Sequence, residues 1–155
     1  MPDKHYDEFL ETTGASRKFV EEIDNFLMDH DCKRAIKPAK SGPTVSYLLQ
    51  DTQKTLATFV CRKTGIKLRI YPQRLHEYME FLDTLPTKMK KEIERASVCK
   101  RLIDPNGCNP KCIMGYDFVM DHQRYQKCRY MAFMPTLTEE STPYIKEFLQ
   151  NELIQ

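Results

Sequence analysis

The chain of 155 residues is 41% hydrophobic and 30% charged, and its formal net charge is +2. This balance excludes an intrinsically disordered chain, and so small a net charge gives no argument for nucleic-acid binding by itself. The length predicts a single domain, 1–155, with one core.

The first turn of the sequence is charged and has no apolar segment behind it, which argues against a signal peptide. No window approaches the roughly 20 apolar residues that a membrane span needs. We therefore expect a cytoplasmic protein with no membrane partner. In that compartment thiols stay reduced, so the six cysteines are not interpreted as three disulfides.

Two helices are predicted at the start of the chain. Residues 4–12 allow a short helix, and 17–29 repeat apolar side chains at helical spacing. Residues 30–43 lose this pattern and carry several cations among prolines and glycines. They are predicted to form a loop, which is either simply solvated or part of an anion-binding surface.

A three-stranded meander is predicted over 44–71, because β-branched and aromatic residues are dense there and the turns are polar. Its last strand alternates strictly and presents Lys67, Arg69 and Tyr71 on one face. Such a face either points at water or forms a platform for a ligand.

The second half of the chain repeats this order less regularly. Helices are predicted over 74–97, a cysteine-containing loop over 99–115, a hairpin over 116–134 with a long strand from Tyr125 to Met134, and a helix over 139–153. The pattern predicts an α+β fold. Its mostly antiparallel sheet has helices packed on one face and consists of two strand–strand–helix halves.

Four cysteines, Cys99, Cys108, Cys112 and Cys128, follow the spacing C-x8-C-x3-C-x15-C. Four thiolates are a usual structural site for zinc, and we expect these side chains to come together, with zinc as the ion if one is bound. Two other interpretations stay open: they are core or loop residues, or Cys108 and Cys112 carry thiol chemistry.

Basic and aromatic residues on two predicted strands could share one face. These candidate ligand-binding residues are Lys67, Arg69, Tyr71, Tyr125, Lys127 and Arg129. Cations interleaved with aromatic rings suit nucleic acid or another anionic ligand. Because no catalytic motif is recognisable, we expect a binding or regulatory module rather than an enzyme. The alternative is a thiol-dependent enzyme or redox protein that uses Cys108 or Cys112.

Several runs of the sequence resemble a group of small bacterial proteins with no assigned activity. The runs are CKRL, CNPKC, GYDF and YQKCRYMAF, together with RKTGIKLRIYP earlier in the chain. The resemblance implies a fold type and a bacterial cytosolic setting, and it implies no catalytic residues. More distantly, the strand–strand–helix arrangement is similar to small bacterial domains of the YdhG and TfoX type, which is an analogy of fold alone.

Overall fold

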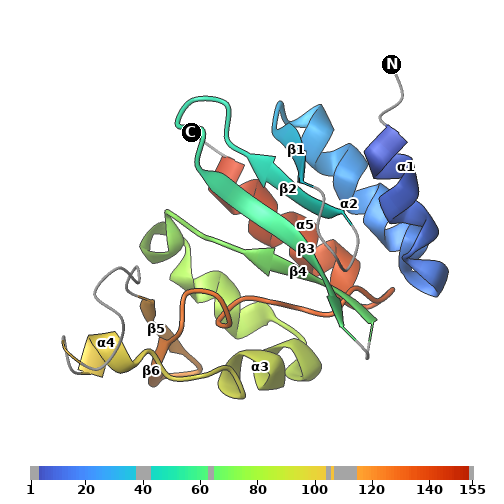
Figure 1. Ribbon diagram of the computed structural model, residues 1–155. Coiled ribbons are helices and arrows are strands. Elements are labelled where there is room, and N and C mark those ends of the chain that lie inside the picture. Colours follow the sequence, from blue (N-terminus) through green and yellow to red (C-terminus); the bar gives the residue numbers. More distant parts are fainter. Residues whose placement is uncertain (1–3, 38–42, 63–64, 104–105, 107–114, 154–155) are drawn as a thin grey trace.

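Four antiparallel strands in chain order form the larger sheet of the protein (Figure 1). The computed structural model describes residues 4–37, 43–62, 65–103, 106 and 115–153. The strands are β1 (Lys33–Lys37), β2 (Thr44–Leu48), β3 (Thr55–Arg62) and β4 (Gly65–Ile70). The predicted meander is therefore present as β2 to β4. The buried side chains of β4 alternate along the strand, so its sequence pattern assigns one face to the core.

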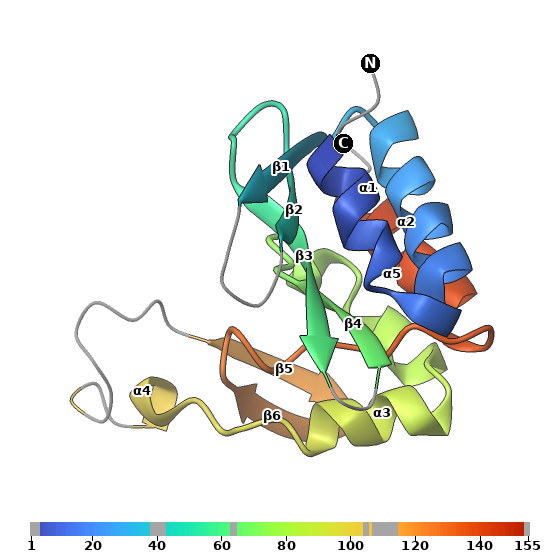
Figure 2. The same cartoon turned by 45° about the vertical axis from the view of Figure 1, so that its right-hand side comes forward.

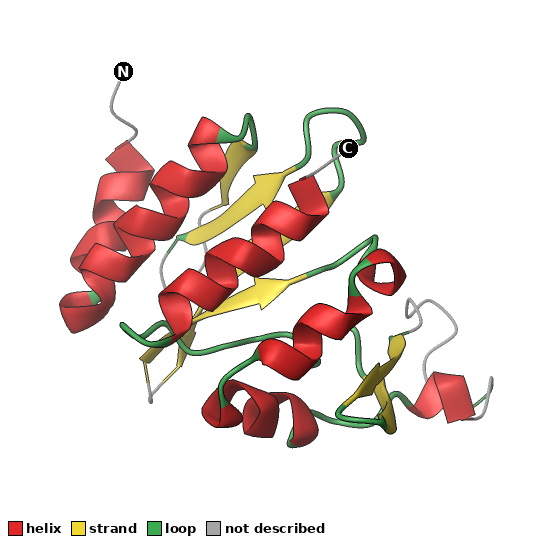
Figure 3. Ribbon diagram, turned by 180° about the vertical axis from the view of Figure 1, so that it is seen from behind, coloured by secondary structure: helices red, strands yellow, loops and turns green. Residues whose placement is uncertain are grey.

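Helices cover one face of this sheet (Figures 1 and 3). They are α1 (Lys4–Glu11), α2 (Arg17–Asp29) and α5 (Ser141–Leu153), with a short 3₁₀ turn, η1 (Gly14–Ser16), between the first two. The helices predicted at both ends of the chain are confirmed. Helix α5 begins where Thr138 and Ser141 cap each other, since each hydroxyl accepts the backbone N–H of the other, at 3.0 and 2.9 Å. In the described residues no helix is long and apolar enough to cross a membrane.

Strand β1 corrects the prediction of a loop over 30–43. Its residues pair with β2 along the whole strand. Arg34 points to the helices and binds Asp24 of α2, while Lys33 and Lys37 are exposed on the other side. Lysines on an edge strand prevent it from pairing with other chains. The density of cations therefore marked a sheet edge rather than a loop.

A second module lies below the larger sheet (Figure 2). It contains the 3₁₀ helices η2 (Leu75–Glu77) and η3 (Met79–Thr84), the helices α3 (Thr87–Glu94) and α4 (Lys100–Ile103), and the hairpin β5 (Tyr116–Met120) with β6 (Gln123–Lys127). The first part of the helical region predicted over 74–97 is thus of 3₁₀ type, and α3 is its α-helical part. The N–H of Tyr78 donates to a carbonyl three residues back, and the backbone φ of −141° at this residue separates the two short helices.

The long strand predicted from Tyr125 to Met134 is wrong beyond Lys127. The N–H groups of Met131 and Ala132 both donate to the Cys128 carbonyl, at 3.0 and 2.8 Å, and this turn ends the pairing with β5. Alternation in the sequence continues through the turn, which is why it indicated a single strand.

After this turn the chain runs along the free edge of β4. The N–H of Ile70 donates to the carbonyl of Phe133 at 2.8 Å, and that of Leu68 donates to the carbonyl of Pro135 at 3.1 Å. Residues 133–137 therefore cover the β4 edge and connect the two modules.

One hydrophobic core joins these parts into a single domain. Phe148 of α5 lies at its centre, with ring centroids 5.7 Å from Phe81, 5.4 Å from Phe133 and 6.0 Å from Tyr78. Because Phe148 belongs to a helix on the larger sheet, whereas Phe81 and Tyr78 belong to the second module, the two halves share their buried surface.

Candidate functional site

The face of the larger sheet away from the helices is rich in cations. Alternation along the strands places five cations there: Lys33, Lys37, Arg62, Lys67 and Arg69. The sequences of the four strands contain no Asp or Glu. We call this surface the outer face. Among the described elements no helix covers it (Figures 1 and 3).

A polar row crosses the middle of the outer face. Ser46, Thr58 and Arg69 are paired in register on β2, β3 and β4, and the two hydroxyl oxygens lie 2.9 Å apart. The Nε of Arg69 is buried and has no hydrogen-bond partner among the described residues. A buried guanidinium N–H with no acceptor is unusual, so Arg69 could donate a hydrogen bond to a ligand atom at this row.

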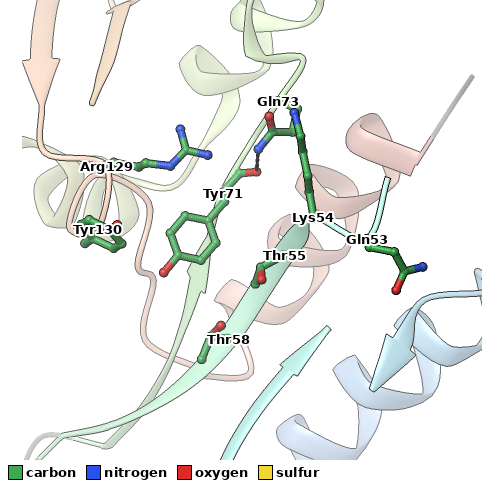
Figure 4. Close-up of a pocket in the computed structure, with 8 residues that line it drawn as sticks. All are labelled: Gln53, Lys54, Thr55, Thr58, Tyr71, Gln73, Arg129 and Tyr130. Carbon is green, nitrogen blue, oxygen red and sulfur yellow. Dashed lines mark hydrogen bonds between the residues drawn. The ribbon is translucent and has the colours of Figure 1, made fainter. Parts of the chain in front are cut away.

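A cavity of about 650 Å³ lies next to this row, on the same face (Figure 4). Its lining residues are Gln53, Lys54, Thr55, Thr58, Tyr71, Gln73, Arg129 and Tyr130. We call it the Tyr71–Arg129 pocket. Its volume is in the range of pockets that hold small ligands.

Aromatic rings and a guanidinium shape the interior of the pocket. Arg129 and Tyr130 follow β6 and reach Tyr71, which directly follows β4 (Figure 4). The guanidinium carbon of Arg129 is 5.7 Å from the centroid of the Tyr71 ring. The ring of Tyr130 meets that of Tyr71 edge to face, with centroids 6.0 Å apart, and Tyr130 is 41% exposed. The pocket therefore offers an accessible ring face beside a cation.

Charge in the pocket is not neutralised by its lining, which contains no carboxylate. Arg129 makes no hydrogen bond or ion pair with another described residue, and its guanidinium carbon also lies 5.4 Å from the Tyr116 ring. Burial raises the pKa of Tyr116, although Arg129 opposes the shift, so the hydroxyl stays protonated. This hydroxyl has no partner among the described residues. Arg129, beside the rings of Tyr71 and Tyr130, can bind an anion and a planar ring together.

The six predicted ligand-binding residues do not form one face. Arg69 and Lys67 lie on the outer face, and Tyr71 and Arg129 line the pocket. Tyr125 and Lys127 lie elsewhere, in the second module. The ammonium of Lys127 is buried and donates to the carbonyls of Glu94 and Ala96, at 2.8 and 3.0 Å.

Tyr125 also faces α3, since its hydroxyl donates to the Glu94 carboxylate at 3.2 Å. The separation arises because the chain turns at Cys128, so that Arg129 leaves the strand on which Lys127 lies. The pair Tyr125 and Lys127 therefore holds the hairpin against the end of α3, and a role of these two residues in ligand binding stays a prediction.

The structure places Cys99 and Cys128 on neighbouring backbone segments, where Cys99 is opposite Gln126 and Cys128 is opposite Ser97. They lie one residue on either side of a bridge between Val98 and Lys127. Cys99 is buried, and its sulfur accepts the N–H of Gly115 at 3.3 Å. A thiol and a thiolate can both accept such a bond, so this contact is compatible with the zinc interpretation and with the core interpretation.

Cys108 and Cys112 lie outside the described residues. In the ranges that are described, no group of three or more His, Cys, Asp or Glu side chains could hold a metal ion. The four-cysteine zinc site, with Cys108 and Cys112 as ligands, therefore stays a prediction. The same holds for thiol chemistry at these two cysteines.

Sequence reasoning predicted only Tyr71 and Arg129 of the eight residues that line the pocket and missed the other six. Tyr130 is adjacent to Arg129, but the predicted strand placed the two side chains on opposite faces. Lys54 and Thr55 lie within the predicted meander over 44–71, and no binding role was predicted for them. Recognising the turn after Lys127 would have allowed us to place Tyr130 in the pocket. Turns are usually recognised by Gly or Pro, and residues 128–131 contain neither.

Comparison of the chain with protein-family models, with curated proteins and with solved structures finds no match.

Proposed function

We propose that the protein binds single-stranded nucleic acid on the outer face, with a base in the Tyr71–Arg129 pocket. The observation that carries the proposal is the combination of Tyr71, Tyr130 and Arg129 in a cavity without a carboxylate. Proteins that bind single strands combine aromatic rings, on which bases stack, with cations that follow the backbone. The pocket offers the rings, and the outer face offers the cations.

The surface around the pocket favours a strand over a single small anion. Lys33, Lys37 and Arg62 have no charged partner among the described residues and lie on strands that extend away from the pocket. An isolated nucleotide would use the pocket alone. A strand also uses cations along the sheet, and each one that neutralises a phosphate makes binding more sensitive to salt.

The proposal includes the cellular setting implied by the resemblance. We infer a bacterial cytoplasmic protein whose role is binding or regulation. Supporting this setting, the cysteines in the described ranges are free: Cys32, Cys61, Cys99 and Cys128. Free thiols are usual in a reducing compartment.

The first test is a fluorescence anisotropy titration of labelled, mixed-sequence single-stranded DNA and RNA at low and moderate salt. Tyr130→Ala is expected to weaken binding by about 1–3 kcal/mol, the usual contribution of one stacked base. Arg129→Gln is expected to lower the slope of log K against log salt by roughly 0.7, the value for one phosphate on a single strand.

Lys18→Gln is the matched control for Arg129→Gln. Lys18 is exposed on α2, on the helical side of the sheet, and the substitution removes the same charge. It is expected to leave the salt slope unchanged. No binding to either nucleic acid at low salt would refute the proposal, and equal effects of Lys18→Gln and Arg129→Gln would move the binding site elsewhere.

A further inference from the structure

A second cavity, of about 510 Å³, lies beside Lys67 of β4. Lys67 and Tyr71, which lines the first pocket, are at opposite ends of the same row of outward side chains. Helix α3, Lys67 of β4 and the segment that covers the β4 edge form its walls. The residues that line it are Lys67, Lys88, Lys91, Glu92, Arg95, Ala96, Met131, Met134 and Thr136. We call it the α3 cavity. Four of its nine lining side chains are cations, and one is a carboxylate.

The sequence of α3 sets this charge. Lys88, Lys91 and Arg95 recur three and four positions apart, which places them on one side of the helix, and all three are exposed. The opposite side carries Met89 and Ile93, which are buried in the core. The helix is therefore fixed by its apolar side, and its basic side faces the cavity.

The single carboxylate of the cavity already has partners. One oxygen of Glu92 accepts the hydroxyl of Thr136 at 2.8 Å and its N–H at 3.2 Å, and lies 3.4 Å from the ammonium of Lys67. Lys88, Lys91 and Arg95 make no ion pair with a described residue. A solvated basic helix face would explain their exposure, but it would not explain why they surround a cavity.

Strand β4 connects the α3 cavity to the Tyr71–Arg129 pocket. Lys67 lines the first, Tyr71 lines the second, and Arg69 lies between them in the same outward row. Four residues of extended strand span about 13 Å. The turn between β6 and the covering segment also runs from one cavity to the other, because Arg129 lines the pocket and Met131 lines the α3 cavity.

From this arrangement we infer that the α3 cavity is a phosphate-binding subsite for the same strand whose base occupies the Tyr71–Arg129 pocket. The nucleic-acid strand would run along β4. Arg69 would lie between its two ends, and its backbone phosphates would bind Lys88 and Lys91. This inference rests on the proposed function. It adds the path of the nucleic acid, along β4, and a minimum length for a ligand that reaches both cavities. A strand too short to span β4 would use the pocket alone.

The test compares a labelled thymidine dinucleotide, which is too short to cross the roughly 13 Å between the two cavities, with a labelled oligothymidylate of about 16 nucleotides, the upper end of the site sizes known for single-strand binding folds. The longer strand is expected to bind more tightly and with a steeper salt slope. Lys88→Gln/Lys91→Gln is expected to lower the slope of the longer strand by about 1.4, or roughly 0.7 for each lost phosphate contact. The same double variant is expected to leave binding of the shorter strand unchanged.

Lys4→Gln/Lys18→Gln removes the same charge from α1 and α2 and serves as the control. If both double variants change the longer strand equally, or if both strands have the same salt slope, the inference is wrong while the proposed function stands. If neither strand binds at low salt, both are wrong. Loss of short-strand binding in Lys88→Gln/Lys91→Gln also overturns the inference, because it would place the primary site at α3. Circular dichroism of the variants confirms that all of them fold.

Discussion

Gly115 shows how closely the backbone is packed at the start of β5. A Cβ atom added to this residue would lie 2.0 Å from the carbonyl oxygen of Lys127 and 3.0 Å from the Cβ of Cys99. Only a residue without a side chain allows this approach. The contact fixes the start of the hairpin against the strand end that leads into Arg129 and the pocket.

Gly115→Ala is therefore expected to destabilise the protein by more than about 3 kcal/mol, since backbone atoms would have to move apart. Urea unfolding monitored by circular dichroism measures the loss. Gly14→Ala is the comparison, because Gly14 has a positive φ of 56° and open space around it. Its cost is expected to be only the roughly 1–2 kcal/mol of a left-handed backbone. Equal costs for the two variants would contradict the predicted clash.

Helix α5 forms hydrogen bonds with residues that lie more than 70 positions earlier in the sequence. The carboxylate of Glu152, which is 5% exposed, accepts the backbone N–H of Gln73 at 2.7 Å and of Arg74 at 3.1 Å. It also accepts the hydroxyl of Tyr78. These bonds hold the turn that follows Tyr71, so the last helix positions one wall of the pocket.

Glu152→Gln is expected to lower the free energy of unfolding by about 1.5–3 kcal/mol, because the amide turns N–H groups toward donors that need an acceptor. Glu147→Gln, on the exposed side of the same helix, is expected to change it by less than about 0.5 kcal/mol. Chemical denaturation of both variants gives the comparison. A cost for Glu152→Gln no larger than that of Glu147→Gln would show that the turn is held in another way.

Elements with one clear periodicity could be predicted from the sequence. The helices at both ends, strands β2 to β4 and the hairpin follow from their patterns, and the burial of Ile66, Leu68 and Ile70 confirms the alternation of β4. Strand β1 could not be predicted this way, because its inward residue Arg34 is a cation that is satisfied by Asp24, a partner ten residues earlier. Tertiary contacts override local pattern at such positions.

The candidate site was predictable only in part, for a related reason. Tyr71 was assigned correctly to the outward row of β4, since this depends on alternation alone. Its proximity to Arg129 depends on the turn at Cys128, and the burial of Lys127 depends on carbonyls of α3. Long-range placement of this kind leaves no local signal in a single sequence.

At the scale of the whole molecule, the larger sheet and the second module share one core. Phe118 and Phe133 are 5.1 Å apart, and Phe133 in turn meets Phe148. Residues 133–137 add a backbone connection along β4. Neither module has a separate apolar centre in the described residues, so neither is expected to fold alone.

Unfolding is accordingly expected to be one cooperative transition. Urea curves followed by far-ultraviolet circular dichroism and by tyrosine fluorescence should coincide, as they do for two-state domains of this size. Limited proteolysis should leave no stable half. Separate midpoints, or a protease-resistant fragment that contains only one of the two sheets, would contradict a shared core.

The position of α5 in the chain also affects how the protein can fold during synthesis. Ile145, Phe148 and Leu149 cover the centre of the larger sheet, yet they are made more than 70 residues after β4 ends. A nascent chain that has emerged only as far as Glu140 leaves that apolar surface exposed to water. Such exposed sheets are prone to aggregation, so folding in the cell is expected to finish late and to be sensitive to chaperone supply.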